Sequence, residues 1–191
     1  MSENNMTVLL GGDAGQGIKS TGKGFCKALG RSGLFVFGRQ DYKSRIRGGH
    51  NFFEIRISDH QIHTHLGEID LLIALTPDTI DKHLEDIVEG GAVIYEKEFE
   101  VDERAIRDKG IVTFPTPLKR IAQEEGGAKV MANTAAIGAV AGVTNYDLSF
   151  IEKVIEENFE RKGNEIVENN KKVAEAGFEY VKGMNKDFEK S

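Results

Sequence analysis

A glycine-rich segment between an apolar strand and a helix constrains this chain more than any other feature of its sequence. Residues 6–10 read as a short buried strand, and residues 11–17 contain four glycines before a helix begins. The apolar residues of that helix share one face: Ile18, Phe25, Cys26 and Leu29. Glycines let the backbone bend sharply and approach a ligand, and a helix start attracts anions through its N–H groups and dipole. The segment therefore predicts a strand–turn–helix unit suited to a phosphorylated ligand.

Two well-known phosphate-binding loops do not match this segment. A Walker A loop needs lysine directly after its second glycine, whereas Ile18 separates Gly17 from Lys19 here. A dinucleotide fingerprint needs G-x-G-x-x-G and an acidic residue near the end of the second strand. The glycines are instead spaced Gly12-x-x-Gly15-x-Gly17, and Gly38-Arg39 follows the second strand. A tight turn with no ligand stays open as an alternative.

The remaining pattern alternates strands and helices, which predicts an α/β fold. Short apolar runs predict buried strands at residues 34–37, 71–75, 92–95 and 111–114, and Pro77 begins a helix over residues 77–89. Alternation at residues 51–57 predicts a strand with one wet face, paired with 61–66 as a β-hairpin around 51–66. Helical spacing predicts C-terminal helices over residues 133–143, 151–159 and 166–181. We expect a three-layer α/β/α Rossmann-like domain with a mostly parallel sheet.

Composition narrows the functional classes. The 191 residues are 39% hydrophobic and show no linker, which favours a single domain over residues 1–191. No run reaches the roughly 20 apolar residues of a membrane span, and the first residues lack a signal-peptide pattern, so we expect a cytoplasmic protein without a membrane partner. The net charge of −6 argues against nucleic acid. The single cysteine, Cys26, cannot by itself hold an iron–sulfur cluster or structural zinc.

A basic segment follows the second predicted strand. Residues 39–56 contain five cationic and two acidic side chains, whereas the whole chain has a net charge of −6. Arginine grips phosphate with two parallel hydrogen bonds, so Arg45 and Arg47 are candidate ligands, and Gly48 and Gly49 allow close backbone approach. Ligands of open α/β sheets bind outside the carboxyl ends of strands, which predicts that this loop lies beside Gly15. A solvated loop or a subunit contact is the alternative.

Other signals are weaker. Lys19, Lys23, Lys27 and Arg31 recur every four residues, and beyond Lys19 this stripe reads as a solvated or partner-facing edge. The alternating His63 and His65 lack a convincing set of further ligands, so no metal site is expected. No nucleophile elbow or triad is recognisable, and no catalytic residue is assigned to this chain.

Three motifs in order resemble the gamma subunit, or gamma domain, of 2-oxoacid:ferredoxin oxidoreductases of the pyruvate, 2-oxoglutarate or ketoisovalerate type. They are Gly-Asp-Ala-Gly-Gln-Gly-Ile-Lys-Ser-Thr-Gly at 12–22, Ser-Arg-Ile-Arg-Gly-Gly-His-Asn at 44–51 and Asn-Thr-Ala-Ala-Ile-Gly at 133–138. Residues 159–162, 169–170 and 176–178 resemble the C-terminal helices of the same family, so the resemblance covers about residues 6–181. Asp13-Ala14 replaces the commoner Gly-x-Gly-Gly opening.

The resemblance implies an oxidoreductase complex that decarboxylates a 2-oxoacid and forms acyl-CoA. Thiamine diphosphate and [4Fe-4S] clusters are then held by alpha, beta and ferredoxin-like delta subunits, electrons pass to external ferredoxin, and the isolated chain is inactive. This chain contributes assembly and part of the coenzyme A site. Motif position implies these cofactor-binding residues: Gly12, Gly15, Gln16, Gly17, Lys19, Ser20, Arg45, Arg47, Gly48, Gly49 and Asn133.

Two alternatives to such a subunit are a free-standing NADP- or nucleotide-binding enzyme and an assembly module without a ligand. The broken fingerprint and the missing catalytic set disfavour the first. The sequence does not identify the 2-oxoacid, and it leaves open whether the chain is a free subunit or a domain of a fused alpha chain. A homodimer of the isolated chain is likewise left open.

Overall fold

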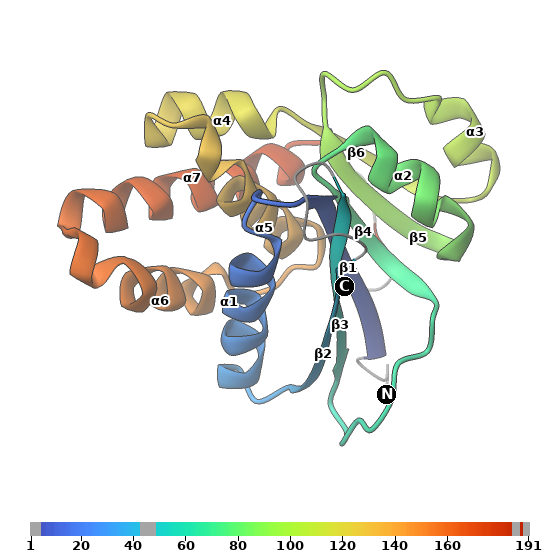
Figure 1. The fold of residues 1–191 in the computed structure, drawn as a ribbon, viewed down its shortest axis with the longest axis horizontal. Coiled ribbons are helices and arrows are strands. Elements are labelled where there is room, and N and C mark those ends of the chain that lie inside the picture. Colours follow the sequence, from blue (N-terminus) through green and yellow to red (C-terminus); the bar gives the residue numbers. More distant parts are fainter. Residues whose placement is uncertain (1–4, 43–48, 185–187, 189–191) are drawn as a thin grey trace.

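A twisted sheet with helices on both faces forms the centre of the structure (Figure 1). The computed structural model describes residues 5–42, 49–184 and 188. Within these residues the sheet has six strands in the order β2-β3-β1-β4-β5-β6. Their bounds are β1 Asn5–Asp13, β2 Phe35–Tyr42, β3 His50–Ser58, β4 Ile69–Ala74, β5 Ile87–Glu96 and β6 Val112–Thr116. The α/β class predicted from the alternating pattern is confirmed.

The sheet is mixed because β3 runs against its two neighbours. It pairs antiparallel with β1 on one side and with β2 on the other, whereas β1, β4, β5 and β6 pair in parallel. The strands β1 and β2 therefore share a direction, as the crossover pattern predicted, but they are not neighbours. The predicted partner strand at 61–66 is wrong. Both edges of β3 are already paired along its length, so no edge is left for that segment.

The predicted wet face of β3 is also wrong. Phe52 and Glu54, which alternate with the core residue Phe53, are buried as well. Glu54 is 3% exposed, and its carboxylate binds Arg39 at 2.6 Å and His65 at 2.7 Å. A charge can be buried when it is paired and hydrogen-bonded. The Glu54 carboxylate that indicated a solvent-facing side is thus buried, and it is paired with a half-exposed arginine.

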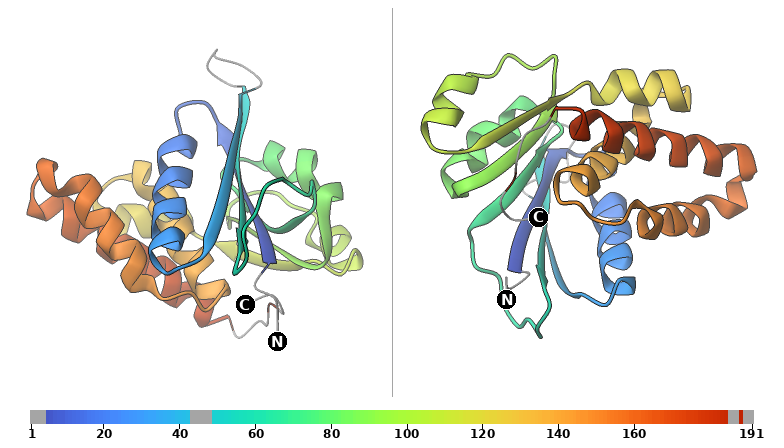
Figure 2. Two further views of the ribbon diagram at one scale, coloured as in Figure 1. Left: turned by 90° about the horizontal axis from the view of Figure 1, so that it is seen from below. Right: turned by 180° about the vertical axis from the view of Figure 1, so that it is seen from behind.

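The helices are unequally divided between the two faces of the sheet. Among the described residues, five helices lie on one side of the sheet and two short ones on the opposite side, over β4 and β5 (Figure 2). The first group is α1 Ile18–Arg31, α4 Leu118–Gly126, α5 Ala132–Val143, α6 Leu148–Phe159 and α7 Asn164–Lys182. The second group is α2 Pro77–His83 and α3 Glu103–Asp108. Three-residue 3-10 turns lie at Leu84–Asp86, Lys129–Met131 and Glu160–Lys162. No helix in the described part of the chain has both the length and the apolar character that crossing a membrane requires.

The helix predicted over residues 77–89 begins correctly at Pro77 but ends at His83. Strand β5 begins at Ile87 and continues through Gly90-Gly91, which the sequence had indicated as a helix end. Ile87 pairs with Ile69 of β4, and the register shifts before Leu71 pairs with Ala92. The glycines therefore accommodate an irregularity inside a strand, where Gly90 has a positive φ of 78°. The helices α3 and α4 were not predicted.

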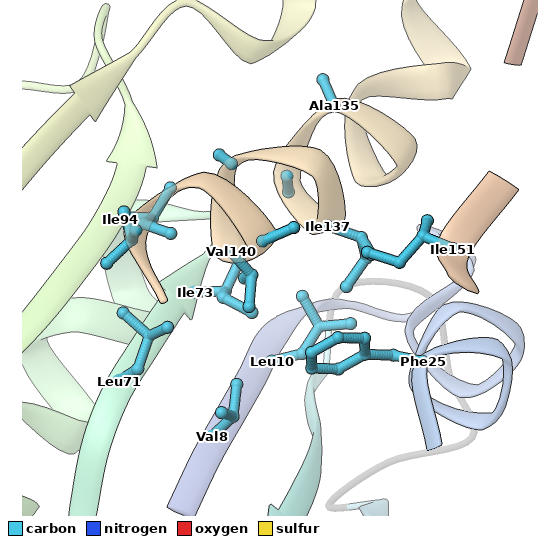
Figure 3. Packing of buried hydrophobic residues seen from close by; sticks show 14 of the residues in the cluster. Val8, Leu10, Phe25, Leu71, Ile73, Ile94, Ala135, Ile137, Val140 and Ile151 are labelled. Carbon is cyan, nitrogen blue, oxygen red and sulfur yellow. The ribbon is translucent and has the colours of Figure 1, made fainter. Parts of the chain in front are cut away.

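The main core lies between the sheet and the five-helix side. Val8, Leu10, Leu71, Ile73 and Ile94 project from neighbouring parallel strands towards α1 and α5 (Figure 3). Phe25 of α1 meets this group, and Ile137 and Val140 of α5 lie over it (Figure 3). Because α5 is buried along most of its length, it has no strong amphipathic pattern and reads as a run of small apolar residues.

A surface ion-pair cluster joins α1 to α6. The carboxylate of Glu157 contacts Lys27 and lies 2.5 Å from Arg31, and hydrogen bonds from Arg31 and Lys27 lower its pKa from 4.5 to about 2. A folded-state pKa below the unfolded value stabilises the fold above pH 4.5, and this stabilisation is lost as the pH falls towards 2.

We expect Glu157→Gln to reduce the fall in stability between pH 4.5 and 2, since the variant has no carboxylate to titrate there. Denaturant unfolding at a series of pH values checks this, with Glu175→Gln on the exposed side of α7 as the matched control. If the free energy of unfolding of wild type and of Glu157→Gln fell equally between pH 4.5 and 2, this expectation would be contradicted.

Candidate functional site

The glycine-rich turn lies at the point where the strand-to-strand connections on its two sides run in opposite directions along the sheet. From β1 the chain crosses through α1 to β2 on one side, and from β4 it crosses through α2 to β5 on the other. Since β1 and β4 are parallel neighbours, the turn at residues 14–17 lies at a topological switch point of the sheet. Ligands of open α/β sheets bind at such points, outside the carboxyl ends of the strands. The predicted turn between β1 and α1 therefore lies where such folds bind ligands, a location that follows from the strand order.

Two glycines give the turn its shape. Gly15 has φ 97° and Gly17 has φ 76°, in the left-handed region that favours glycine. A Cβ on Gly15 would have no atom within 4 Å, so the backbone there faces open space. A Cβ on Gly17 would instead lie 2.7 Å from Nδ2 of Asn133. Gly15 is therefore accessible to a ligand, whereas Gly17 is also required by internal packing.

Side chains of the motif support the turn from within. The Gln16 Oε1 accepts a hydrogen bond from the Asp13 N–H at 2.7 Å. A Cβ on Gly12 would lie 2.3 Å from that same oxygen, so Gly12 provides the space for the Gln16 side chain. The Ser20 hydroxyl donates to the Gly17 carbonyl at 2.9 Å. These contacts give Gly12 and Gln16 a supporting role, which their position in the motif did not indicate.

Asn133 connects the turn to α5, 112 residues or more along the chain. Its Nδ2 donates to the Gln16 carbonyl at 3.3 Å and to the Thr21 hydroxyl at 2.9 Å. Motif position alone had placed Asn133 among the cofactor-binding residues, but it does not line the hollow beside the turn. The structure shows that it holds the turn and the first turn of α1 against the start of α5.

Replacing Asn133 by alanine is expected to lower the free energy of unfolding by about 1–2 kcal/mol, because two part-buried hydrogen bonds are lost. Asn133→Asp keeps the shape but cannot donate unless protonated, so it should lose a similar amount at neutral pH. Chemical denaturation of the three proteins measures both effects. A fully stable aspartate variant would show that these hydrogen bonds do not hold the turn.

An open hollow of about 460 Å³ lies beside the turn. Lys19 and Lys23 bring two positive charges to it, Asp13 brings one negative charge, and Ser20 adds a hydroxyl. Its full lining is Asp13, Gly15, Gly17, Ile18, Lys19, Ser20, Lys23, Gln40 and Asn51. No acidic residue lies in the first turn of α1, and no side chain in the described residues caps it. The hollow therefore combines a helix start, flexible glycine backbone and a net positive charge, which suits phosphate.

The basic loop predicted to flank the turn is only partly within the described residues. The Ala14 N–H donates to the Gly49 carbonyl at 3.2 Å, which places the end of the loop against the turn as expected. Arg45, Arg47 and Gly48 lie outside the described residues. Arg39 is bound to Glu54, and its guanidinium carbon lies 5.8 Å from the centre of the Phe52 ring. It is thus held by β3, while the adjacent Gln40 lines the hollow.

Several lining residues were not predicted. Lys23 had been interpreted as part of a solvated stripe, although its position one helical turn after Lys19 could have indicated a shared site. Gln40 and Asn51 reach the hollow only because β2 and β3 pair beside β1.

The single cysteine, Cys26, does not line this hollow, and burial raises the pKa of its thiol to about 11. The thiolate, which is the reactive form, is therefore disfavoured.

Comparisons with known proteins agree on one family. The model of the pyruvate ferredoxin/flavodoxin oxidoreductase family matches residues 7–180. The 2-oxoglutarate synthase subunit KorC of Methanothermobacter thermautotrophicus is 31% identical over 149 residues, which are 75% of this chain and 79% of that protein.

Two solved structures share the fold. The keto/oxoacid ferredoxin oxidoreductase gamma subunit of Geobacter sulfurreducens matches with a TM-score of 0.73 and 26% identity, over 92% of this chain and 98% of that one. The 2-oxoglutarate:ferredoxin oxidoreductase of Magnetococcus marinus, solved with 2-oxoglutarate, coenzyme A and succinyl-CoA bound, matches with a TM-score of 0.88 and 24% identity. That match covers 96% of this chain and 32% of the other. The chain also spans 15% of the length of related Sulfolobus and Sulfurisphaera alpha subunits.

Proposed function

Since this chain belongs to the pyruvate ferredoxin/flavodoxin oxidoreductase family, we propose that it works as the gamma component of a 2-oxoacid:ferredoxin oxidoreductase. The complete enzyme decarboxylates a 2-oxoacid oxidatively, transfers the acyl group to coenzyme A and passes the electrons to ferredoxin. The gamma subunit of Geobacter sulfurreducens, nearly all of which is matched, supports a free subunit. The longer alpha-type relatives support a fused arrangement in other organisms.

The observation that carries the ligand assignment is the open, positively charged hollow at the Gly15 turn. Coenzyme A has a diphosphate and a ribose phosphate, and both need cations and N–H donors. Lys19 and Ser20 with the backbone of Gly15 form the diphosphate side of the proposed site. Arg45, Arg47 and Gly48 are proposed as further ligands by their position in the motif, and they lie outside the described residues. The contact between Ala14 and Gly49 supports a loop that ends beside the turn. Coenzyme A bound in the Magnetococcus enzyme supports the same ligand class.

The other centres belong to partner subunits in this proposal. Thiamine diphosphate and [4Fe-4S] clusters would be held by alpha, beta and ferredoxin-like delta subunits, in a cytoplasmic complex. The chemical reason is that a cluster needs several thiolates, whereas this sequence has one cysteine, whose thiol is largely buried. The role of this chain is then to position one substrate and to join the assembly. Its surface must make contacts with those partners.

Lys19→Ala tests the site in the assembled enzyme. Loss of one charge-assisted hydrogen bond to phosphate, about 1.5–3 kcal/mol, is expected to raise the KM for coenzyme A by about tenfold or more. The KM for the 2-oxoacid should be unchanged, because the oxoacid is bound by other subunits. Steady-state kinetics with each substrate varied in turn measures both constants.

Lys172→Ala, which removes an exposed lysine on α7, is the matched control for Lys19→Ala. It should leave both KM values unchanged. If Lys19→Ala also leaves the KM for coenzyme A unchanged, the hollow is not the phosphate site. A purified chain that turns over a nucleotide substrate by itself would support the free-standing enzyme instead.

A further inference from the structure

Two buried histidines meet on the α2 side of the sheet. His50 is the first residue of β3 and is 4% exposed, and His83 is the last residue of α2 and is 9% exposed. Their Nε2 atoms lie 2.9 Å apart, so one imidazole donates an N–H to the lone pair of the other. Neither ring lines the hollow beside the turn. These two residues, the histidine pair, are therefore a titratable group that the proposed site does not use.

The absence of a side chain at Gly11 allows the histidines to meet across β1. Strand β1 separates β3 from β4, which leads into α2. A Cβ on Gly11 would lie 2.5 Å from Cγ2 of Thr79, a fully buried residue of α2, and 3.2 Å from Cε1 of His50. The space beside Gly11 is thus filled by side chains from α2 and β3. This glycine serves the contact between them, which its place in a glycine-rich motif did not indicate.

The histidine pair is connected to the glycine-rich turn through the backbone. Gly49 directly precedes His50, and the Gly49 carbonyl accepts the hydrogen bond from the Ala14 N–H at 3.2 Å. His50 is also the cross-strand partner of Asp13, the residue before the turn. The position of the His50 ring therefore influences the backbone that supports the first residue of the turn. Through this ring, α2 acts on a site that lies on the other face of the sheet.

Charged groups surround the histidine pair on several elements. Asp86 contacts the pair directly, because its Oδ2 lies 3.3 Å from Nδ1 of His83. The elements packed around the pair carry further charged side chains: Asp13 of β1, Arg39 and Asp41 of β2, Glu54 of β3, and Asp78 and Lys82 of α2. The two cations of this set are each hydrogen-bonded to an acidic member of it. The surroundings are therefore acidic on balance, and the contact between the two rings limits the charge that the pair can carry.

We propose that His83 is a positioning residue, which acts through His50 to hold Gly49 against the turn as long as the histidine pair carries at most one proton. The effect on coenzyme A rests on the proposed function. The contact needs an N–H on one ring and a lone pair on the other. A second proton places an N–H on both facing nitrogens and two positive charges side by side in a buried place, which is costly. The rings then separate, and the Ala14 N–H loses its support from Gly49.

A glutamine at position 83 separates this role from a merely structural one. Its side-chain oxygen accepts the N–H of His50 whether or not the His50 ring is charged, and glutamine does not titrate. In the assembled enzyme, we expect the KM of wild type for coenzyme A to rise between about pH 7.5 and about pH 5.5 by a factor roughly fivefold larger than that of His83→Gln. Protonation of the coenzyme A phosphates affects both proteins equally. The KM for the 2-oxoacid should have the same pH profile in both.

A second measurement needs neither partner subunits nor coenzyme A. Amide hydrogen exchange of Ala14, followed by NMR in the full-length chain, reports directly on the hydrogen bond to Gly49. After correction for the intrinsic pH dependence of exchange, the protection of this amide should fall with pH in wild type over the same range and persist in His83→Gln. His83→Ala should lack the protection at every pH. Protected amides in the central strand β4 show that each variant is folded.

His60→Gln is the matched control, because the His60 side chain is 76% exposed in the connection after β3 and contacts Asp59. It should match wild type in both measurements. Equal pH dependence of Ala14 protection in wild type and His83→Gln, or full protection in His83→Ala, would overturn the positioning role. If protection follows these expectations while the KM for coenzyme A has the same pH profile in wild type and His83→Gln, the positioning role stands and the assignment of coenzyme A to the hollow fails.

Discussion

Gly138→Val should destabilise the chain by about 3 kcal/mol, through overpacking at a helix–helix contact with no free space. A Cβ on Gly138 of α5 would lie 1.9 Å from the carbonyl oxygen of Ala174 in α7. The reciprocal contact is equally close, since a Cβ on Gly177 would lie 2.2 Å from the carbonyl oxygen of Ala135. Backbone atoms cannot rotate away as a flexible side chain can, so the two helices must separate. Equilibrium denaturation of the purified variant measures the loss.

Gly30→Ala is the matched control for that substitution. Gly30 also lies inside a helix, but a Cβ there would have no atom within 4 Å. Alanine lowers the entropy of the unfolded chain, so this variant should be more stable than wild type by about 0.4–1 kcal/mol. If Gly138→Val unfolded at the wild-type denaturant concentration, the close contact of α5 and α7 would not be a determinant of stability.

The second large expected effect is the dependence of 2-oxoacid oxidation on the partner subunits. The purified chain should not reduce a dye or ferredoxin with any 2-oxoacid, and it should be colourless, because it has one thiol and no recognised thiamine diphosphate site. Adding the alpha, beta and delta subunits should produce 2-oxoacid- and coenzyme A-dependent reduction. The expected change is from no measurable rate to the rate of the complete enzyme.

The control for this reconstitution is the same mixture without this chain. Co-purification from the native source gives an independent readout, because a subunit should bring along chains that contain clusters and thiamine diphosphate. A purified chain that reduces dye with a 2-oxoacid, after contaminants are excluded, would contradict the role as a subunit. A fully active mixture without the chain would show that it is dispensable.

Local sequence determined the elements that depend on short-range rules. The apolar run at residues 6–10 and the glycines after it indicated β1, the turn and α1, because apolar periodicity and positive-φ glycines act within a few residues. The strand was predicted to end too early, since Gly11, Gly12 and Asp13 still pair with β3. The start of α2 at Pro77 and the helices after Met131 followed from the same kind of signal. Four residues that line the hollow, Gly15, Gly17, Lys19 and Ser20, were therefore identified from the motif alone.

Only the tertiary structure decided where β3 lies and what its polar residues do. Alternation predicted a strand there, but a period of two cannot distinguish solvent from a buried ion pair, so Glu54 indicated a wet face that does not exist. The supporting role of Asn133 likewise depends on contacts of the turn and α1 with a helix more than 100 residues away along the chain. Such contacts depend on how surfaces pack, and packing depends on the complete set of neighbours rather than on any local pattern.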